Sequence, residues 1–170
     1  MRKMMHNMRF VAIVFVLVAM SSCSSDSAEA TENGTKTETV VASYTYNDSE
    51  IESMKLINDY RVSIGLNALQ RVNHVSFKCE EHNKYMIANN VVDHNDFTSR
   101  SNNIMSVLGA KKVGENVAYN YKTSEAALRA WLDSPGHKAN IEGDYTHFGL
   151  SVSIDPQTGK KYYTNIFVKM

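Results

Sequence analysis

The chain has 170 residues, and its 18 lysines and arginines balance 18 aspartates and glutamates, so its formal net charge at neutral pH is zero. That balance excludes the basic excess of a nucleic-acid-binding surface, and we expect no nucleic-acid partner. Two cysteines, Cys23 and Cys79, are too few for the disulfide framework of a small exported domain.

The first 22 residues have the pattern of a signal peptide. Residues 1–9 carry three basic residues and no acid, and residues 10–20, FVAIVFVLVAM, are apolar without a break. Such a run is too short to span a bilayer as a mature helix. The AMSSC segment that follows resembles a bacterial lipobox, with Met20 in place of the usual leucine. It predicts that Cys23 is the lipidated mature N-terminus, through which the chain binds a membrane.

A soluble exported protein with an unmodified Cys23 is the alternative. Ser24 follows the cysteine, whereas aspartate would favour inner-membrane retention in Gram-negative lipoproteins. We therefore expect an exported bacterial lipoprotein in the outer membrane or at the cell surface. Residues 24–43 are rich in Ser, Thr, Ala and Glu, which predicts a flexible tether. The predicted organisation is a signal peptide at 1–22, a lipidated cysteine with its tether at 23–44, and one domain at 45–170.

The first half of the domain has the apolar spacing of two helices. SEIE at 49–52 predicts a capping box with Ser49 as N-cap, and Gly65 is expected just beyond the end of that helix. A second helix is predicted at 73–90. One of its faces carries Val75, Cys79, His82 and Met86, which we expect in the core.

The second half begins with a polar connection at 93–102. VGENVAY at 113–119 indicates a strand. The stretch 123–134 predicts a helix that is capped by Thr123 or Ser124 and closed by Pro135.

An antiparallel hairpin ends the domain. HFGLSVSI and YYTNIFVK alternate in polarity around the turn residues DPQTGKK. Helices followed by a hairpin indicate an α+β fold with helices packed on an antiparallel sheet.

Two histidines and one acid are the candidates for chemistry. His94 and His137 each follow a predicted helix end, where functional side chains are often placed. Glu115 lies in an apolar segment, where a carboxylate needs a partner. Each also has a structural explanation. His94 could be a helix C-cap donor, His137 a turn residue and Glu115 a buried salt-bridge acceptor. His74 is expected to be solvated, and His147 has no assigned role.

The ordered motifs of residues 50–169 resemble the CAP superfamily, or SCP-like extracellular proteins, in its bacterial form. The resemblance rests on LINDYRVSIGLNAL, HNKYMIANNVVDHNDFTSR, VGENVAY, AWLDSPGHKANI, and YTHFGLSV with YYTNIF. It implies a three-layer α-β-α sandwich with a central antiparallel sheet. A large cleft, lined by two histidines and two acids, is implied to bind divalent cations.

Carried over to this chain, the resemblance makes His94, Glu115 and His137 the cleft residues. The second acid of the family falls on Ser134, and Asp133 is one residue short, so the fourth cleft residue is Ser134 or an imperfect Asp133. We expect Pro135 and Gly136 to end the helix so that His137 turns into the cleft. Asn116 and Asn140 are expected to support the cleft.

Two imidazoles and one carboxylate favour zinc, with calcium or magnesium as alternatives. The expected protein is a lipid-anchored envelope protein whose cleft binds a divalent cation and an extracellular ligand, for example a lipid. A metal-dependent hydrolase or protease and a structural or adhesive surface domain are the alternatives. No nucleophile is placed beside a base and the fourth acid is missing, so the residues favour binding over catalysis.

Overall fold

Residues 39–170 of a computed structural model are described, and they form five helices and four strands. The predicted signal peptide and Cys23 lie outside the described residues. In chain order the elements are α1 (Asp48–Ser63), β1 (Gln70–Arg71), α2 (Asn73–Asn89), α3 (Phe97–Leu108), β2 (Lys112–Tyr119), α4 (Ser124–Asp133), α5 (Pro135–Ile141), β3 (His147–Ile154) and β4 (Lys161–Lys169).

The four strands form one sheet in the order β1-β3-β4-β2. β3 and β4 form the predicted antiparallel hairpin, and β2 pairs antiparallel with β4, so that Glu115 stands opposite Ile166. The sheet is not wholly antiparallel, because the two-residue strand β1 pairs parallel to β3. β2 is consequently an edge strand, with one side available to other elements.

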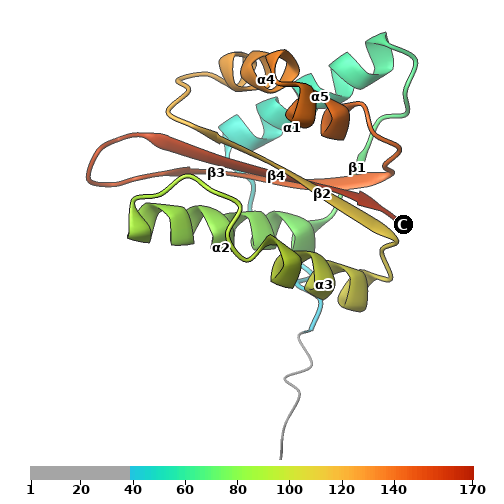
Figure 1. The fold of residues 1–170 in the computed structure, drawn as a ribbon, viewed down its shortest axis with the longest axis horizontal. Coiled ribbons are helices and arrows are strands. Elements are labelled where there is room, and N and C mark those ends of the chain that lie inside the picture. Colours follow the sequence, from blue (N-terminus) through green and yellow to red (C-terminus); the bar gives the residue numbers. More distant parts are fainter. Residues whose placement is uncertain (1–38) are drawn as a thin grey trace, which may run out of the picture. The chain divides into compact units, whose positions relative to one another are not determined.

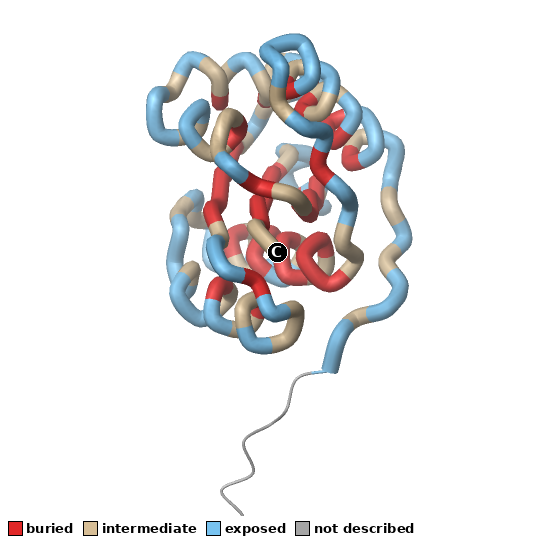
Figure 2. Tube along the Cα trace, turned by 90° about the vertical axis from the view of Figure 1, so that its right-hand side faces the viewer, coloured by how far each residue is buried: buried red, intermediate tan, exposed pale blue. Residues whose placement is uncertain are grey.

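Helices cover both faces of the sheet, which confirms the predicted α+β sandwich of three layers (Figure 1). α1, α4 and α5 lie over one face, and α2 and α3 lie over the other. Neighbouring residues of β4 point to opposite layers, because side chains alternate along a strand. Phe167 packs with Trp131 on the first face, and Ile166 packs with Cys79 on the second. Buried residues gather between the helical layers (Figure 2).

α2 packs very closely on β3. A Cβ atom at Gly149 would lie 2.3 Å from the backbone nitrogen of Ser76, so only glycine allows this approach. Cys79 is fully buried beside it, and its thiol donates to the Gly149 carbonyl oxygen over 3.4 Å. The expectation that Cys79 is a buried core residue is therefore confirmed.

The predicted capping box is wrong by two residues. The N-cap of α1 is Asn47, whose side chain accepts from the Glu50 N–H, while the Glu50 carboxylate accepts from the Asn47 N–H. Ser49 lies inside the helix. Glu50 is buried and also accepts from the backbone N–H of Val152 in β3, a tertiary contact that local spacing cannot reveal.

α3 differs from the sequence prediction, which places a polar connection at 93–102. Ser101 and Ile104 are the buried residues of this helix, and its apolar residues continue past 102 at helical spacing. α3 also explains why the expectation of a solvated His74 is wrong. His74 is buried, with Nε2 bonded to Asn103 of α3 and Nδ1 accepting from the Val41 N–H.

Residues 39–44, which the sequence assigns to the tether, contact the domain. Asn73 donates to the Ala42 carbonyl, and the Tyr44 hydroxyl bonds to Glu50 and Ser151. Among the described helices, none is both long and apolar enough to cross a membrane.

Candidate functional site

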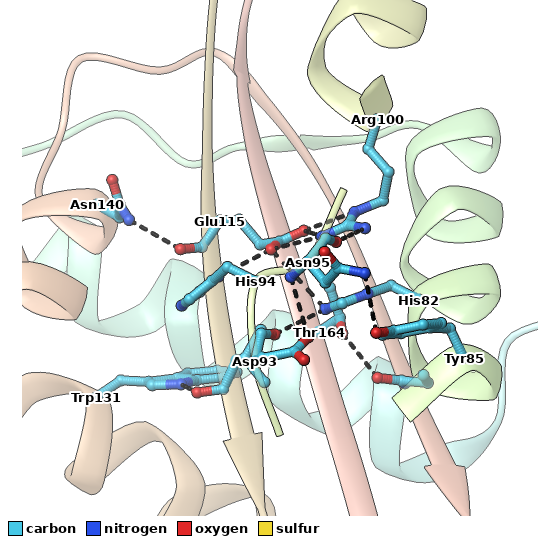
Figure 3. A network of polar contacts seen from close by, with 12 residues as sticks. His82, Tyr85, Asp93, His94, Asn95, Arg100, Glu115, Trp131, Asn140 and Thr164 are labelled. Carbon is cyan, nitrogen blue, oxygen red and sulfur yellow. Dashed lines mark hydrogen bonds and ion pairs between the residues drawn. The ribbon is translucent and has the colours of Figure 1, made fainter. Parts of the chain in front are cut away.

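Glu115 of β2 lies at the centre of a polar network (Figure 3). Its side chain is only 1% exposed and receives a fork of hydrogen bonds from Arg100 of α3. Arg100 Nε donates to Oε2 and Nη2 donates to Oε1, both over 2.9 Å. Sequence patterns do not single out Arg100, because residues 93–102 have the composition of a polar connection. The helical spacing of Arg100 from Ile104 and Leu108 is the available signal.

His94 contacts the same carboxylate from the segment between α2 and α3. Its Nδ1 lies 2.9 Å from Glu115 Oε1. Because a carboxylate only accepts, Nδ1 carries a hydrogen, and Nε2 holds the lone pair when the ring is neutral. The hydrogen bond to Glu115 raises the pKa of His94, against the opposing effect of burial. The ring is half exposed, so its free edge is accessible.

His137 faces His94 from α5, with ring centroids 6.5 Å apart and planes tilted by 39°. Burial, followed by the nearby His94, lowers the pKa of His137. α4 ends before Pro135 as predicted, but His137 is not in a turn: Pro135 begins α5, where its missing N–H costs nothing. The extended backbone of Ser134 separates the two helices.

Two asparagines connect α5 to β2. Asn140 Nδ2 donates to the Glu115 carbonyl over 3.1 Å and to Asn116 Oδ1 over 2.9 Å. Asn116 Nδ2 donates to the His137 carbonyl over 3.0 Å. Asn140 of α5 thus bonds two residues of the edge strand β2. These bonds fix the backbone of His137 relative to that of Glu115.

Gly114, the first residue of the Gly-Glu-Asn segment, leaves space for the side chains of neighbouring residues. A Cβ atom here would lie 2.5 Å from the Tyr145 hydroxyl oxygen and 2.7 Å from Asn140 Oδ1. The glycine thus allows α5 and the chain after it to approach β2 closely.

His82 is a second residue of the site that its sequence pattern places only in the core. It is buried, as predicted for a core histidine, and its Nε2 lies 2.9 Å from the Asp93 carbonyl oxygen and 4.0 Å from Glu115 Oε1. Its Nδ1 has no hydrogen-bond partner among the described residues. Burial lowers the pKa of His82. Helical spacing on α2 could place His82 in the core, but not beside an acid of a distant strand.

The two candidates for a fourth cleft residue lie apart from Glu115. Asp133 is exposed at the end of α4, and within the described chain it has no hydrogen bond or ion pair with the network around Glu115. Ser134 lines a hollow that His137 also lines. The structure therefore brings together His94, Glu115 and His137 without a second acid.

Two hollows of the described surface are each lined by one of the two histidines, whose ring centroids lie 6.5 Å apart, and we call the two hollows together the histidine groove. The first, of about 620 Å³, is lined by His94, by Phe97 and by polar residues just before and within the start of α3. The second, of about 350 Å³, is lined by His137 and mainly apolar and aromatic residues: Val92, Val117, Ala118, Tyr119, Tyr121, Ala130 and Trp131. One end of the groove is therefore polar and the other apolar.

The arrangement does not fit a three-ligand metal centre. Among the described residues, no group of three or more His, Cys, Asp or Glu side chains is placed to hold a metal ion. Both carboxylate oxygens of Glu115 are bonded to Arg100. A cation that used Glu115 would have to lie beside the positively charged guanidinium or displace it.

The fold and the groove define a CAP-type domain, and comparison with known proteins agrees. The model of the Cysteine-rich secretory protein family (CAP) matches residues 54–168, so this chain belongs to that family. YlbC, an uncharacterized membrane protein of Bacillus subtilis (strain 168), is 34% identical over 125 residues. The match covers 71% of this chain but only 34% of YlbC, so the chain spans about a third of that relative.

Two solved structures share the fold. An outer surface protein from Borrelia burgdorferi has a TM-score of 0.62 at 22% identity, over 69% of this chain and 92% of that one. An extracellular protein containing an SCP domain from Bacillus anthracis str. Ames has a TM-score of 0.61 at 25% identity, over 75% of this chain and 45% of that one. The chain is a CAP-domain protein of an extracellular-type family.

Proposed function

We propose that this chain is a lipid-anchored cell-envelope protein whose histidine groove binds an extracellular amphiphilic ligand. The observation that carries the proposal is a polar hollow lined by His94 and a mainly apolar hollow lined by His137, with the two rings 6.5 Å apart. An apolar pocket with a few convergent polar groups is the usual form of a small-molecule site.

The groove suits a ligand with a polar head and an apolar body. His94 Nε2 is the free ring nitrogen, since Nδ1 is engaged by Glu115. The raised pKa of His94 favours the imidazolium, whose Nε2–H donates to a carboxylate head. The aromatic residues of the second hollow contact the apolar body. A fatty acid or a similar single-chain lipid has this chemistry.

Trp131 is the only tryptophan of the chain and lines the second hollow, so it can report binding. We expect energy transfer from Trp131 to a dansyl-labelled undecanoic acid to saturate in the micromolar range. His137→Ala should weaken binding at least tenfold and leave the melting temperature within about 2 °C of the parent. His147→Ala, outside the groove, is the matched control and should bind normally.

Equal binding by His137→Ala would contradict the ligand proposal. A large loss of stability in that variant with no change in binding would favour a structural or adhesive role for the groove residues.

A divalent cation, zinc first, is a second proposal for the same groove. It is motivated by the two facing imidazoles, whose ring centroids lie 6.5 Å apart. Two rings on one tetrahedral zinc ion would have centroids about 5.2 Å apart, so the rings would have to move closer on binding. Zinc titration of the His94→Ala and His137→Ala variants tests it: each should lose most of the affinity of the parent chain.

The lipid anchor is proposed at Cys23, within the lipobox-like AMSSC segment. Metabolic labelling with an alkynyl fatty acid should mark the parent chain and fail for Cys23→Ser. Cys79→Ser is the matched control and should still be labelled. Labelling of Cys23→Ser at the parent level would refute the anchor.

A further inference from the structure

Residues 91–95, which we call the His94 segment, join α2 to α3 and form no helix or strand of their own. The residues on either side of the segment, Asn90 and Asp96, have left-handed backbones with φ of 51° and 56°. No regular ladder of backbone hydrogen bonds fixes such a connection, so its position depends on side chains of other elements.

Both sequence neighbours of His94 are held by side chains of α2 (Figure 3). His82 Nε2 lies 2.9 Å from the Asp93 carbonyl oxygen, and it carries a hydrogen because a carbonyl only accepts. Asn95 Nδ2 donates to the Tyr85 hydroxyl over 2.9 Å. The rings of His82 and Tyr85 are themselves stacked, with centroids 5.9 Å apart and planes 10° from parallel. α2 therefore fixes the segment on each side of His94.

The contact from His82 is the one protected from water. Its side chain is 0% exposed, whereas Asn95 lies at the surface. A hydrogen bond in a site of low local dielectric is stronger than one exposed to water. His82 lines neither hollow of the histidine groove, so any effect that it has on a ligand must pass through the His94 segment.

We propose that His82 is a positioning residue of the histidine groove. Its N–H holds the Asp93 carbonyl so that the free edge of His94 stays directed to the head of the ligand. The same segment carries Val92, which lines the apolar hollow, so this hydrogen bond also sets the spacing between the head and body contacts. The inference rests on the proposed function of the groove.

The test is a double-mutant cycle on binding of dansyl-labelled undecanoic acid to the full chain. We compare the parent, His82→Leu, His94→Ala and the double variant. Each single change should weaken binding by about tenfold, because the head contact is lost or no longer pre-organised. The double variant should also bind about tenfold more weakly than the parent, and not the about hundredfold expected of two independent effects.

A rescue variant and a control separate positioning from general stability. His82→Gln places an amide N–H near the position of the imidazole Nε2–H and should restore binding to within about threefold of the parent. His74 is a second buried histidine of α2, but it bonds Asn103 and lines neither hollow. His74→Leu should therefore bind as the parent does, even if its melting temperature falls.

Three results would overturn the proposal when the parent binds the probe. These are parent-like binding by His82→Leu or by His94→Ala, additive losses in the double variant, and no recovery in His82→Gln. Should His82→Leu lack a cooperative unfolding transition, His82→Asn replaces it under the same criteria, because its shorter amide cannot reach the Asp93 carbonyl.

Failure of the proposed function is a separate result, in which the parent does not bind the probe. NMR of the His94 ring then decides the positioning role without a ligand. The Cε1–H signal of His94 should shift in His82→Leu and return toward its parent position in His82→Gln. An unchanged signal in His82→Leu would overturn the inference.

Discussion

Neutralising either member of the Arg100–Glu115 pair should strongly destabilise the domain, and neutralising both should cost less than the sum. The two side chains form a close ion pair in a site of low exposure. For charge centres about 4 Å apart at an effective dielectric constant of about 20, the attraction is about 4 kcal/mol. We expect Arg100→Met and Glu115→Gln each to lower the free energy of unfolding by about 3–5 kcal/mol. The coupling energy between the two changes should be about 3 kcal/mol.

Urea unfolding followed by Trp131 fluorescence measures this coupling. A matched cycle on Lys55 and Asp59 of α1 supplies the control, since their side chains are 73% and 57% exposed. That pair is screened by solvent and should couple by no more than about 0.5 kcal/mol. A coupling below about 1 kcal/mol for Arg100 and Glu115 would refute the reasoning, because it would place their contact among ordinary surface pairs.

Three further outcomes are expected. In an NMR pH titration, His94 should titrate above the reference pKa of about 6.5 and His137 below it. The contribution of His94 to the free energy of unfolding is therefore complete below a pH of about 6.5 and is lost as the pH rises through the raised pKa of the folded state. The contribution of His137 is present above a pH of about 6.5 and is lost as the pH falls through the lowered pKa of the folded state. Gly114→Ala should lower the free energy of unfolding by about 1–3 kcal/mol in a urea titration, whereas Gly136→Ala, with open space around its Cβ, should leave it unchanged or raise it by up to about 1 kcal/mol. Asn47→Ala should cost about 1 kcal/mol in the same assay through loss of the cap on α1, and an unchanged midpoint would contradict the assigned N-cap.

Local patterns predict the elements that depend on local chemistry. The apolar face of α2, with Cys79 and Met86, is buried as its spacing indicates. Thr123 caps α4 through a hydrogen bond from the Ala126 N–H. The polarity of β3 and β4 predicts their hairpin.

The features that the sequence does not predict depend on tertiary contacts. The sequence does not reveal Arg100, because the polar residues at the start of α3 resemble a loop. Which face of α3 is buried is decided by its packing against the sheet. The spacing on α2 places His82 in the core, but its distance to Glu115 depends on how α2 packs on the sheet. The sequence leaves Glu115 as either a metal ligand or a buried salt-bridge acceptor; its observed partner in the structure is Arg100.

Native mass spectrometry of the full chain, purified from membranes, tests the central claim most directly. The account predicts that the parent chain retains a non-covalent small amphiphile that is lost on collision activation, and that His137→Ala carries none. A parent chain that shows only its own mass, or a His137→Ala variant that retains the same adduct, would contradict a ligand site in the histidine groove.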